Sequence, residues 1–247
     1  MKYIILKHFR VKDWLHYLGY TLLASILSSN LSIINFILTS FLLAYTYSIN
    51  DYYDKKLKEK YFLIPLILSF FFLPFASLFT ITIFLSLSVL FTLYSWPKVW
   101  LEGKPILSTL ANSIGFTLIF LLPVNSIKTI FEYSTLILLI FTLNTAAQLL
   151  HEIVHFKKDR KIAKMTTTVA FGVRISTFLF KMSLIATIFL ALLLSSKLPL
   201  ISLSSILFSS YFLLKRKLKI KVRKTFKILG VFIGIVYSLE LIKISFL

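Results

Sequence analysis

Two acidic residues stand three positions apart where an apolar segment of the chain ends. Asp51 and Asp54 follow Asn50, directly after the hydrophobic residues that run up to Ile49. Residues three apart lie on one face of a helix, so both carboxylates would point the same way. Two carboxylates and a carboxamide are oxygen ligands suited to Mg²⁺, which keeps its other positions for water and phosphate oxygens. The alternative is a solvated helix end whose acids pair with nearby lysines, namely Lys55, Lys58 and Lys60.

A second polar group lies on a later apolar segment. Its five members follow one another at steps of 4, 4, 3 and 4 residues: Asn144, Gln148, Glu152, His155 and Asp159. Such steps place them in one stripe along a helix, and a polar stripe inside a membrane should face a cavity or the protein interior. The sequence therefore predicts a second carboxylate pair, Glu152 and Asp159. The alternative is that Asn144 and Gln148 only hydrogen-bond between helices and that the charges beyond them are solvated.

Basic and aromatic residues accompany both acidic groups. Tyr94 ends an apolar segment and Lys98 follows it; Lys104, Arg160 and Lys161 lie in the same or later loops. Lysines beside a metal-binding carboxylate pair can neutralise the oxygens of a leaving group, an arrangement suited to a diphosphate. A diphosphate site that opens into an apolar cavity indicates a ligand with a charged head and a long hydrocarbon tail. A polyprenyl diphosphate is the natural candidate.

Long apolar segments must position these residues. Of the 247 residues 58% are hydrophobic and 15% charged, with a mean hydropathy of +0.88, which excludes a water-soluble domain. Cysteine is absent, so disulfide and thiolate chemistry are excluded. Spanning a membrane takes about 20 mostly apolar residues, and backbone in lipid must satisfy its own hydrogen bonds. We expect an all-α integral membrane protein, with residues 1–247 forming a single bundle of about nine transmembrane helices at 14–29, 31–49, 62–77, 79–95, 107–124, 130–150, 169–194, 198–214 and 228–246.

The basic charge predicts the topology. The formal net charge is +19, and most of the 28 Lys and Arg residues fall in alternate loops, whereas the opposite loops hold only Lys128 and Lys197. Cytoplasmic loops carry the excess of Lys and Arg. We therefore expect a multi-pass protein of the cell membrane with its N-terminus, and both acidic groups, at the cytoplasmic face. Nucleic acid is not expected as a partner, because no soluble segment remains to read bases.

The three motifs together resemble those of the UbiA superfamily of intramembrane prenyltransferases. That family carries NDxxDxxxD, then YxxxK, then a second Asp-rich motif, on nine transmembrane helices. Here the corresponding stretches are NDYYDKKLK at 50–58, YSWPK at 94–98 and EIVHFKKD at 152–159, and the resemblance covers essentially the whole chain. The chain departs from the pattern at three positions: Lys58 replaces an acid of the first motif, and Glu152 and His155 replace acids of the last.

The resemblance implies Mg²⁺-dependent transfer of a polyprenyl group from a polyprenyl diphosphate to a lipophilic or aromatic acceptor within the membrane. The metal ligands it implies are Asp51, Asp54, Glu152 and Asp159. The residues it implies for catalysis are Asp51, Asp54, Asp159, His155 and Lys98. The residues it implies for binding the diphosphate or the acceptor are Asn50, Lys58, Tyr94, Lys98, Lys104, Asn112, Asn144, Gln148, Arg160 and Lys161. For Asn112, Asn144 and Gln148, hydrogen bonding in the core is an equal alternative.

Two other functions are compatible with parts of the sequence. A catalytically impaired relative would bind isoprenoid lipid without turnover, and the changes at Lys58 and His155 motivate that alternative. A transporter would place acids at the bilayer midplane on broken helices, where this chain instead has Lys181. The acceptor, the prenyl chain length and the oligomeric state do not follow from the sequence.

Two features of the last apolar segment suggest structural roles. Gly230 and Gly234 form a GxxxG step, which predicts close packing against another helix. Glu240 and Lys243 stand three apart and are expected to form a structural pair.

Overall fold

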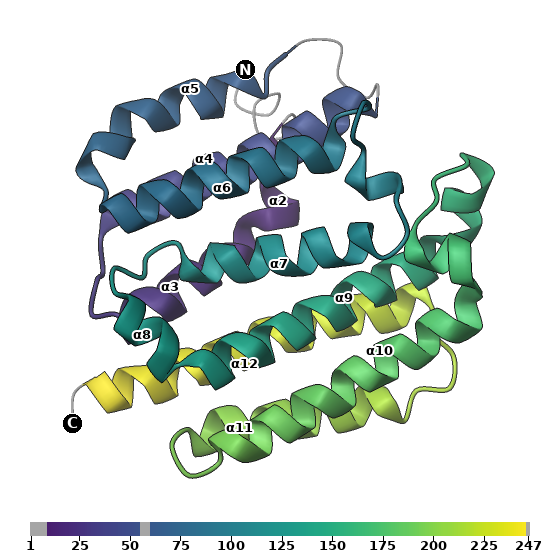
Figure 1. Ribbon diagram of the computed structural model, residues 1–247. Coiled ribbons are helices and arrows are strands. Elements are labelled where there is room, and N and C mark those ends of the chain that lie inside the picture. Colours follow the sequence, from purple (N-terminus) through teal and green to yellow (C-terminus); the bar gives the residue numbers. More distant parts are fainter. Residues whose placement is uncertain (1–8, 55–59, 246–247) are drawn as a thin grey trace. The chain divides into compact units, whose positions relative to one another are not determined.

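The computed structural model describes residues 9–54 and 60–245, and its regular elements are helices (Figure 1). Lys58, with its neighbours 55–59, lies outside the described residues. The chain divides into two compact units. Unit 1 comprises residues 1–100 and 118–129, and unit 2 comprises residues 101–117 and 130–247.

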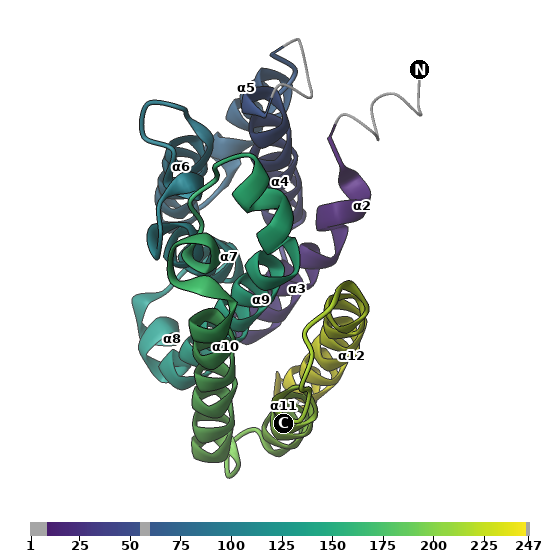
Figure 2. The same ribbon diagram turned by 90° about the vertical axis from the view of Figure 1, so that its right-hand side faces the viewer.

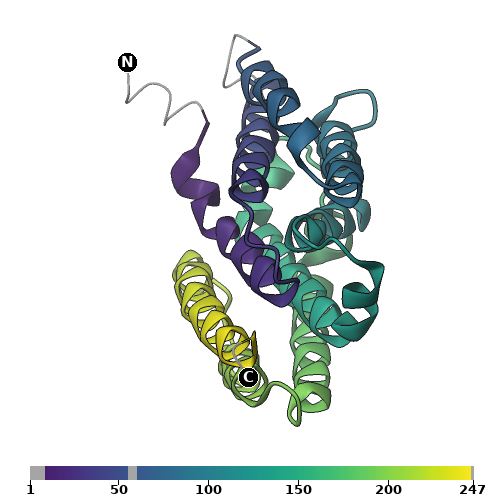
Figure 3. The ribbon, with the colours of Figure 1, turned by 90° about the vertical axis from the view of Figure 1, so that its left-hand side faces the viewer.

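Unit 1 is built around the helix that ends in the first acidic motif, α4 (Ile33–Tyr53). It packs against α3 (Leu18–Leu27), α5 (Leu63–Phe72) and α6 (Leu78–Ser95), which Figure 3 shows in purple and blue. The short helix α2 (Val11–Trp14) precedes them. The described part also contains 3-10 turns at Leu15–Tyr17 and Leu73–Phe75.

Serine caps fix where α4 and α6 begin. The hydroxyl of Ser32 accepts a hydrogen bond from the N–H of Ile34, and that of Ser77 accepts one from the N–H of Thr80. A side-chain oxygen at this position satisfies a backbone donor that the first turn of a helix leaves unpaired. Each helix therefore starts at a local signal that the sequence carries.

Buried and partly buried polar contacts set the register of the unit 1 helices. Thr21 of α3 donates to Thr39 of α4 over 3.0 Å, and the hydroxyls of Tyr45 and Thr92 lie 2.6 Å apart between α4 and α6. Because α5 returns the chain, α4 and α6 run in the same direction (Figure 1). The C-terminal ends of α4 and α6 consequently lie at the same end of unit 1.

Unit 2 contains the longest helices of the described chain. Helix α9 (Ser134–Lys161) packs on α10 (Thr167–Leu194), and α10 packs on α11 (Pro199–Leu213). Helix α12 (Ile220–Ser245) packs against both α11 and α9, and Figure 2 shows it beside α11. Most of α7 (Leu107–Leu121) also belongs to this unit, and α8 (Ile127–Glu132) precedes α9. A 3-10 turn lies at Leu101–Gly103.

The core of unit 2 is aromatic and aliphatic. Phe180 of α10, Phe208 and Phe212 of α11 and Phe226 of α12 are all at least 92% buried, with Phe208 and Phe226 ring centroids 4.7 Å apart. Edge-to-face rings at this spacing attract one another beyond the area that they bury. This cluster holds α10, α11 and α12 together.

Helix α10 is broken near its start. Gly172 has φ 82° and ψ 162°, so the residues before and after it form two helical pieces. That backbone conformation is essentially restricted to glycine. The first piece is anchored separately, because the hydroxyl of its N-cap residue Thr166 accepts a hydrogen bond from the N–H of Val169.

The last helix departs from the sequence-based predictions. A side-chain carbon added at Gly230 or Gly234 would meet nothing within 4 Å, so the predicted close packing at the GxxxG step is wrong for the described residues. Glu240 is 4% exposed and accepts hydrogen bonds from the N–H groups of Leu200 and Ile201. It therefore caps the start of α11, which differs from the predicted structural pair with Lys243.

The prediction of an all-helical membrane protein is confirmed. Five described helices are long and apolar enough to cross a membrane: α4, α6, α9, α10 and α12; α5, α7 and α11 are shorter and apolar. Each of the nine predicted segments overlaps a helix of the described chain. That all nine cross the membrane, that they form one bundle, and which side the N-terminus occupies stay predictions.

Candidate functional site

The first acidic motif lies on the last turn of α4. The helix ends because Asp54 adopts φ −72° and ψ 4°, with its N–H still bonded to the carbonyl of Asn50 over 2.9 Å. Asp51 is 8% exposed, whereas Asp54 is exposed. The rings of Tyr45 and Tyr52 on α4 pack against Phe62 before α5, with centroids 6.2 and 5.1 Å away. This aromatic cluster fixes the end of α4 in unit 1.

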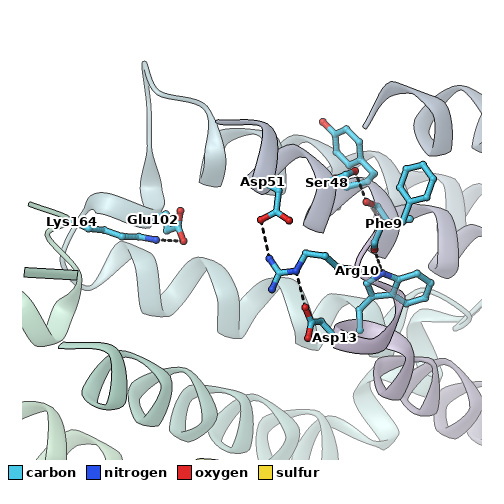
Figure 4. Close-up of polar contacts among 10 residues, drawn as sticks. Phe9, Arg10, Asp13, Ser48, Asp51, Glu102 and Lys164 are labelled. Carbon is cyan, nitrogen blue, oxygen red and sulfur yellow. Dashed lines mark hydrogen bonds and ion pairs between the residues drawn. The ribbon is translucent and has the colours of Figure 1, made fainter. Parts of the chain in front are cut away.

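Arg10 lies against the motif, from a region that sequence reasoning assigned only to membrane topology. Its Nη1 is 3.1 Å from Oδ1 of Asp51 and its Nε is 2.7 Å from Oδ2 of Asp13, as Figure 4 shows. Its guanidinium also lies over the ring of Tyr47, 5.1 Å from the centroid, a distance at which a cation is attracted to the ring face.

The surroundings of Arg10 keep it charged. Burial lowers the pKa of Arg10, but the hydrogen bond to Asp13 and the negative charges of Asp51 and Asp13 outweigh it, so the pKa is raised. A permanent positive charge therefore sits on one oxygen of Asp51. The sequence signal that could have found it is the spacing Arg10–Asp13, which suits an ion pair but does not indicate Asp51.

The YxxxK motif begins on the last turn of α6. Trp96 leaves the helix with φ −67° and ψ 123°, as expected of a residue before proline. Lys98 is exposed, and its Nζ lies 5.7 Å from the centroid of the Trp96 ring; Tyr94 is half-buried. Since α4 and α6 run in parallel and are held by Tyr45 and Thr92, this motif and NDYYD lie at the same end of unit 1.

In unit 2 the carboxylate of Glu152 is surrounded by donors. It is 1% exposed, and its Oε1 accepts hydrogen bonds from Ser108 at 3.2 Å, Thr109 at 2.9 Å and Gln148 at 3.2 Å. Its Oε2 accepts one from the backbone N–H of Thr168 at 3.1 Å. An ionised carboxylate offers about four lone-pair sites, so four donors use most of its capacity. Glu152 is thus placed to hold α7, α9 and the first turn of α10 together.

Threonine side chains extend this network. The hydroxyls of Thr109 and Thr167 lie 2.7 Å apart, and Oγ1 of Thr167 also accepts a hydrogen bond from the N–H of Ile106 at 3.0 Å. Nearby, Lys164 forms an ion pair with Glu102, also drawn in Figure 4. These contacts fix the loop between α9 and α10 to the start of α7.

The rest of the predicted stripe divides among different partners. Asn144 is buried, and its Nδ2 donates to Thr117 of α7 over 3.4 Å. Nε2 of His155 lies 3.0 Å from Nη1 of Arg223 on α12. Since arginine can only donate, Nε2 of His155 is the acceptor and carries no proton. Asp159, the last member, is 8% exposed.

The other predicted binding residues of unit 2 differ in their exposure to solvent. Lys104, Arg160 and Lys161 are exposed, and Asn112 is half-buried on α7. The three cations are therefore accessible to an anion from solvent or the membrane surface, whereas Asn112 is only partly accessible.

The candidate metal ligands of the two acidic motifs differ in how well they suit Mg²⁺. Asn50, Asp51 and Asp54 supply the hard oxygen atoms that the ion prefers, although Asp51 already contacts Arg10. Glu152 fits poorly, because its oxygens accept four hydrogen bonds, and Nε2 of His155 faces a cation. In unit 2, Asp159 is the remaining candidate. Within either unit, the described residues contain no group of three His, Asp or Glu side chains placed to share one metal ion.

Solved structures of other proteins share the fold of this chain. No protein-family model matches the chain, and no curated protein matches its sequence. Solved structures do match over nearly the full length. A UbiA homolog from Archaeoglobus fulgidus bound to DMAPP and Mg²⁺ aligns with a TM-score of 0.74 and 15% identity, over 97% of this chain and 99% of that one. The chain has the UbiA fold.

Two further structures with the UbiA fold agree. The Archaeoglobus fulgidus homolog bound to GPP and Mg²⁺ gives a TM-score of 0.74 at 16% identity, over 97% of this chain and 99% of that one. A digeranylgeranylglyceryl phosphate synthase gives 0.74 at 20% identity, over 98% and 100% of the two chains. The resemblance that the motifs predicted is therefore confirmed at the level of the fold.

Proposed function

We propose that this protein transfers a prenyl group from a prenyl diphosphate to a lipophilic or aromatic acceptor in the membrane, with the aid of Mg²⁺. The observation that carries the proposal is the NDYYD motif at the end of α4 in a chain whose fold matches UbiA homologs almost end to end. Those homologs are described as bound to DMAPP or GPP together with Mg²⁺. We place the reaction at the cytoplasmic face, following the loop charges.

At this site the residues of unit 1 bind and orient the donor. Asp51 and Asp54, with the carboxamide of Asn50, are the proposed Mg²⁺ ligands. Bound Mg²⁺ supplies positive charge that stabilises the diphosphate as a leaving group. Lys98 and Tyr94, at the same end of unit 1, are the proposed partners of the diphosphate oxygens.

In unit 2 we assign Asp159 as the carboxylate of the second motif, with Arg160 and Lys161 as further diphosphate contacts. Glu152 acts as a positioning residue in this proposal, because its hydrogen bonds fix the helix that carries Asp159. The guanidinium of Arg223 donates to Nε2 of His155. This hydrogen bond occupies the nitrogen, and the positive charge opposes its protonation, so His155 is disfavoured as a proton acceptor. Lys58 stays a predicted diphosphate contact.

The reaction breaks the bond between C1 of the prenyl chain and the diphosphate oxygen, and the electron pair leaves with the diphosphate. A bond then forms between C1 and a nucleophilic atom of the acceptor, which loses a proton to solvent or to the diphosphate. The buried apolar residues of the helices exclude water that would otherwise capture C1. Asn112, Asn144 and Gln148 are the proposed polar contacts for the acceptor.

Two observations favour the second candidate, a relative that binds isoprenoid lipid without turnover. Arg10 occupies one oxygen of Asp51, and Glu152, which replaces an acid of the family motif, is used by hydrogen bonds. A resident cation on Asp51 would compete with Mg²⁺ for that oxygen. The site would then hold a diphosphate without activating it.

Diphosphate release tests the two candidates. The full-length protein in detergent is given geranylgeranyl diphosphate, Mg²⁺ and a panel of aromatic and lipid acceptors, beside Asp54→Ala. Asp54 is exposed, so the variant should fold. Glu132→Ala, an exposed acid outside both motifs, is the matched control.

The transferase is supported if diphosphate release needs an acceptor and stops when EDTA removes Mg²⁺. Release should also fall at least about 100-fold in Asp54→Ala and persist in Glu132→Ala. Removing a group that stabilises the transition state typically costs a factor of this order. Binding of the diphosphate, with or without Mg²⁺, but without release from any acceptor supports the second candidate. The absence of any diphosphate binding contradicts both.

A further inference from the structure

A basic groove lies at one end of unit 2, apart from the residues assigned above. It has a volume of about 580 Å³, and Lys157, Lys219 and Lys221 contribute to its lining. Apolar residues from α9 and from the α11–α12 connection also line it, among them Val154, Phe156 and Leu218.

Four chain segments meet at this end of the unit. They are the last turns of α9, the first turns of α10, the α11–α12 connection and the first turn of α12 (Figure 1). Helix α9 has 28 residues, more than the about 20 that cross the hydrocarbon. We therefore expect its charged last turns, which include Lys157, to extend to the level of the lipid head groups.

The charge and polarity of the basic groove are complementary to an amphipathic anion. Every charged residue of its lining is a lysine, and all three lysines are exposed. Within the described residues none of the three forms an ion pair with a carboxylate. Long lysine side chains lay their methylenes on apolar surface and extend the ammonium toward the head-group region.

We propose that the basic groove binds an anionic phospholipid of the surrounding membrane. The lipid phosphate contacts Lys157, Lys219 and Lys221, and the first carbons of the acyl chains lie on Val154, Phe156 and Leu218. Basic pockets between transmembrane helices bind anionic head groups in this way. The proposal does not depend on the transferase activity, because none of these residues is assigned to it.

Native mass spectrometry of the full-length, delipidated protein tests the proposal. The probe is dioleoyl phosphatidylglycerol, with dioleoyl phosphatidylcholine and inorganic phosphate as separate comparisons. The test variant is K157Q/K219Q/K221Q. The matched control is K158Q/K217Q/K224Q, which removes three exposed lysines from the same segments but none that line the groove.

We expect the groove variant to bind phosphatidylglycerol at least about tenfold more weakly than the wild type, since each lysine near an anionic head group adds to the attraction. The control variant should keep its affinity, and both should melt like the wild type when no lipid is present. Single substitutions of the three groove lysines give the same reading if the triple variant fails to fold.

Three outcomes would overturn the proposal. Equal losses in the two triple variants would mean that the lysines act only through the general charge of this face. Equal binding of phosphatidylcholine would remove the role of the negative charge. If inorganic phosphate at equal concentration competes with phosphatidylglycerol, the groove is a simple anion site and its apolar lining contributes nothing to binding.

Discussion

The start of α10 should unfold more readily in Glu152→Ala than in the wild type. The substitution removes the acceptor of four hydrogen bonds at a position that is 1% exposed. The hydroxyls of Ser108 and Thr109 can rotate to other acceptors, and the amide of Gln148 can turn. The backbone N–H of Thr168 cannot turn, so it loses its bond inside the protein.

The expected loss follows from these contacts. An orphaned buried backbone donor costs about 1–3 kcal/mol, and the space left by the removed side chain adds about 1–2 kcal/mol. The release of a buried charge offsets part of this sum, which gives about 3 kcal/mol for Glu152→Ala. Glu152→Gln should cost about 1 kcal/mol, because one amide oxygen can still accept from Thr168.

Thermal unfolding of the detergent-purified protein measures the effect. For a chain of this size about 1 kcal/mol shifts Tm by about 2–4 °C, so Glu152→Ala should melt about 6–12 °C lower. Hydrogen exchange at Thr168 and its neighbours should accelerate in Glu152→Ala but little in Glu152→Gln, with Glu132→Ala as control. A loss below about 1 kcal/mol in Glu152→Ala, or equal losses in both variants, would refute the role of Glu152 as the hub of this network.

Two single substitutions and two double-mutant cycles test other features of the structure. Gly172→Ala should lower stability by about 1–3 kcal/mol in thermal unfolding, because its φ of 82° strains any residue with a side chain although the space is open. Glu240→Gln should cost about 1 kcal/mol in the same assay, since one amide oxygen can replace only one of the two carboxylate caps on α11. Double-mutant cycles should give a coupling free energy of about 1 kcal/mol between Arg10 and Asp51, and a smaller one between Arg10 and Asp13. The Asp13 contact is shorter, but its side chain is 48% exposed and therefore screened by water. A larger coupling free energy with Asp13 than with Asp51 would contradict this account.

The sequence by itself determined the helices and the residues of the motifs. Apolar runs of membrane length predict helices because hydrogen bonding in lipid leaves few alternatives, and each of the nine predicted segments holds one. The end of α4 at NDYYD, and the end of α6 before Pro97, follow from residues adjacent in the chain. Such signals are local, and the structure retains them.

Only the tertiary structure decided what the charged residues touch. Arg10 reaches Asp51 across 41 positions, Thr109 reaches Glu152 across 43, and the N–H of Ile201 reaches Glu240 across 39. The periodicity of α9 placed Glu152 on a polar face but could not tell a metal ligand from a carboxylate that accepts four hydrogen bonds inside the protein. That distinction depends on which helix packs opposite, and helix pairing is set by the shapes of many side chains at once rather than by the motif itself.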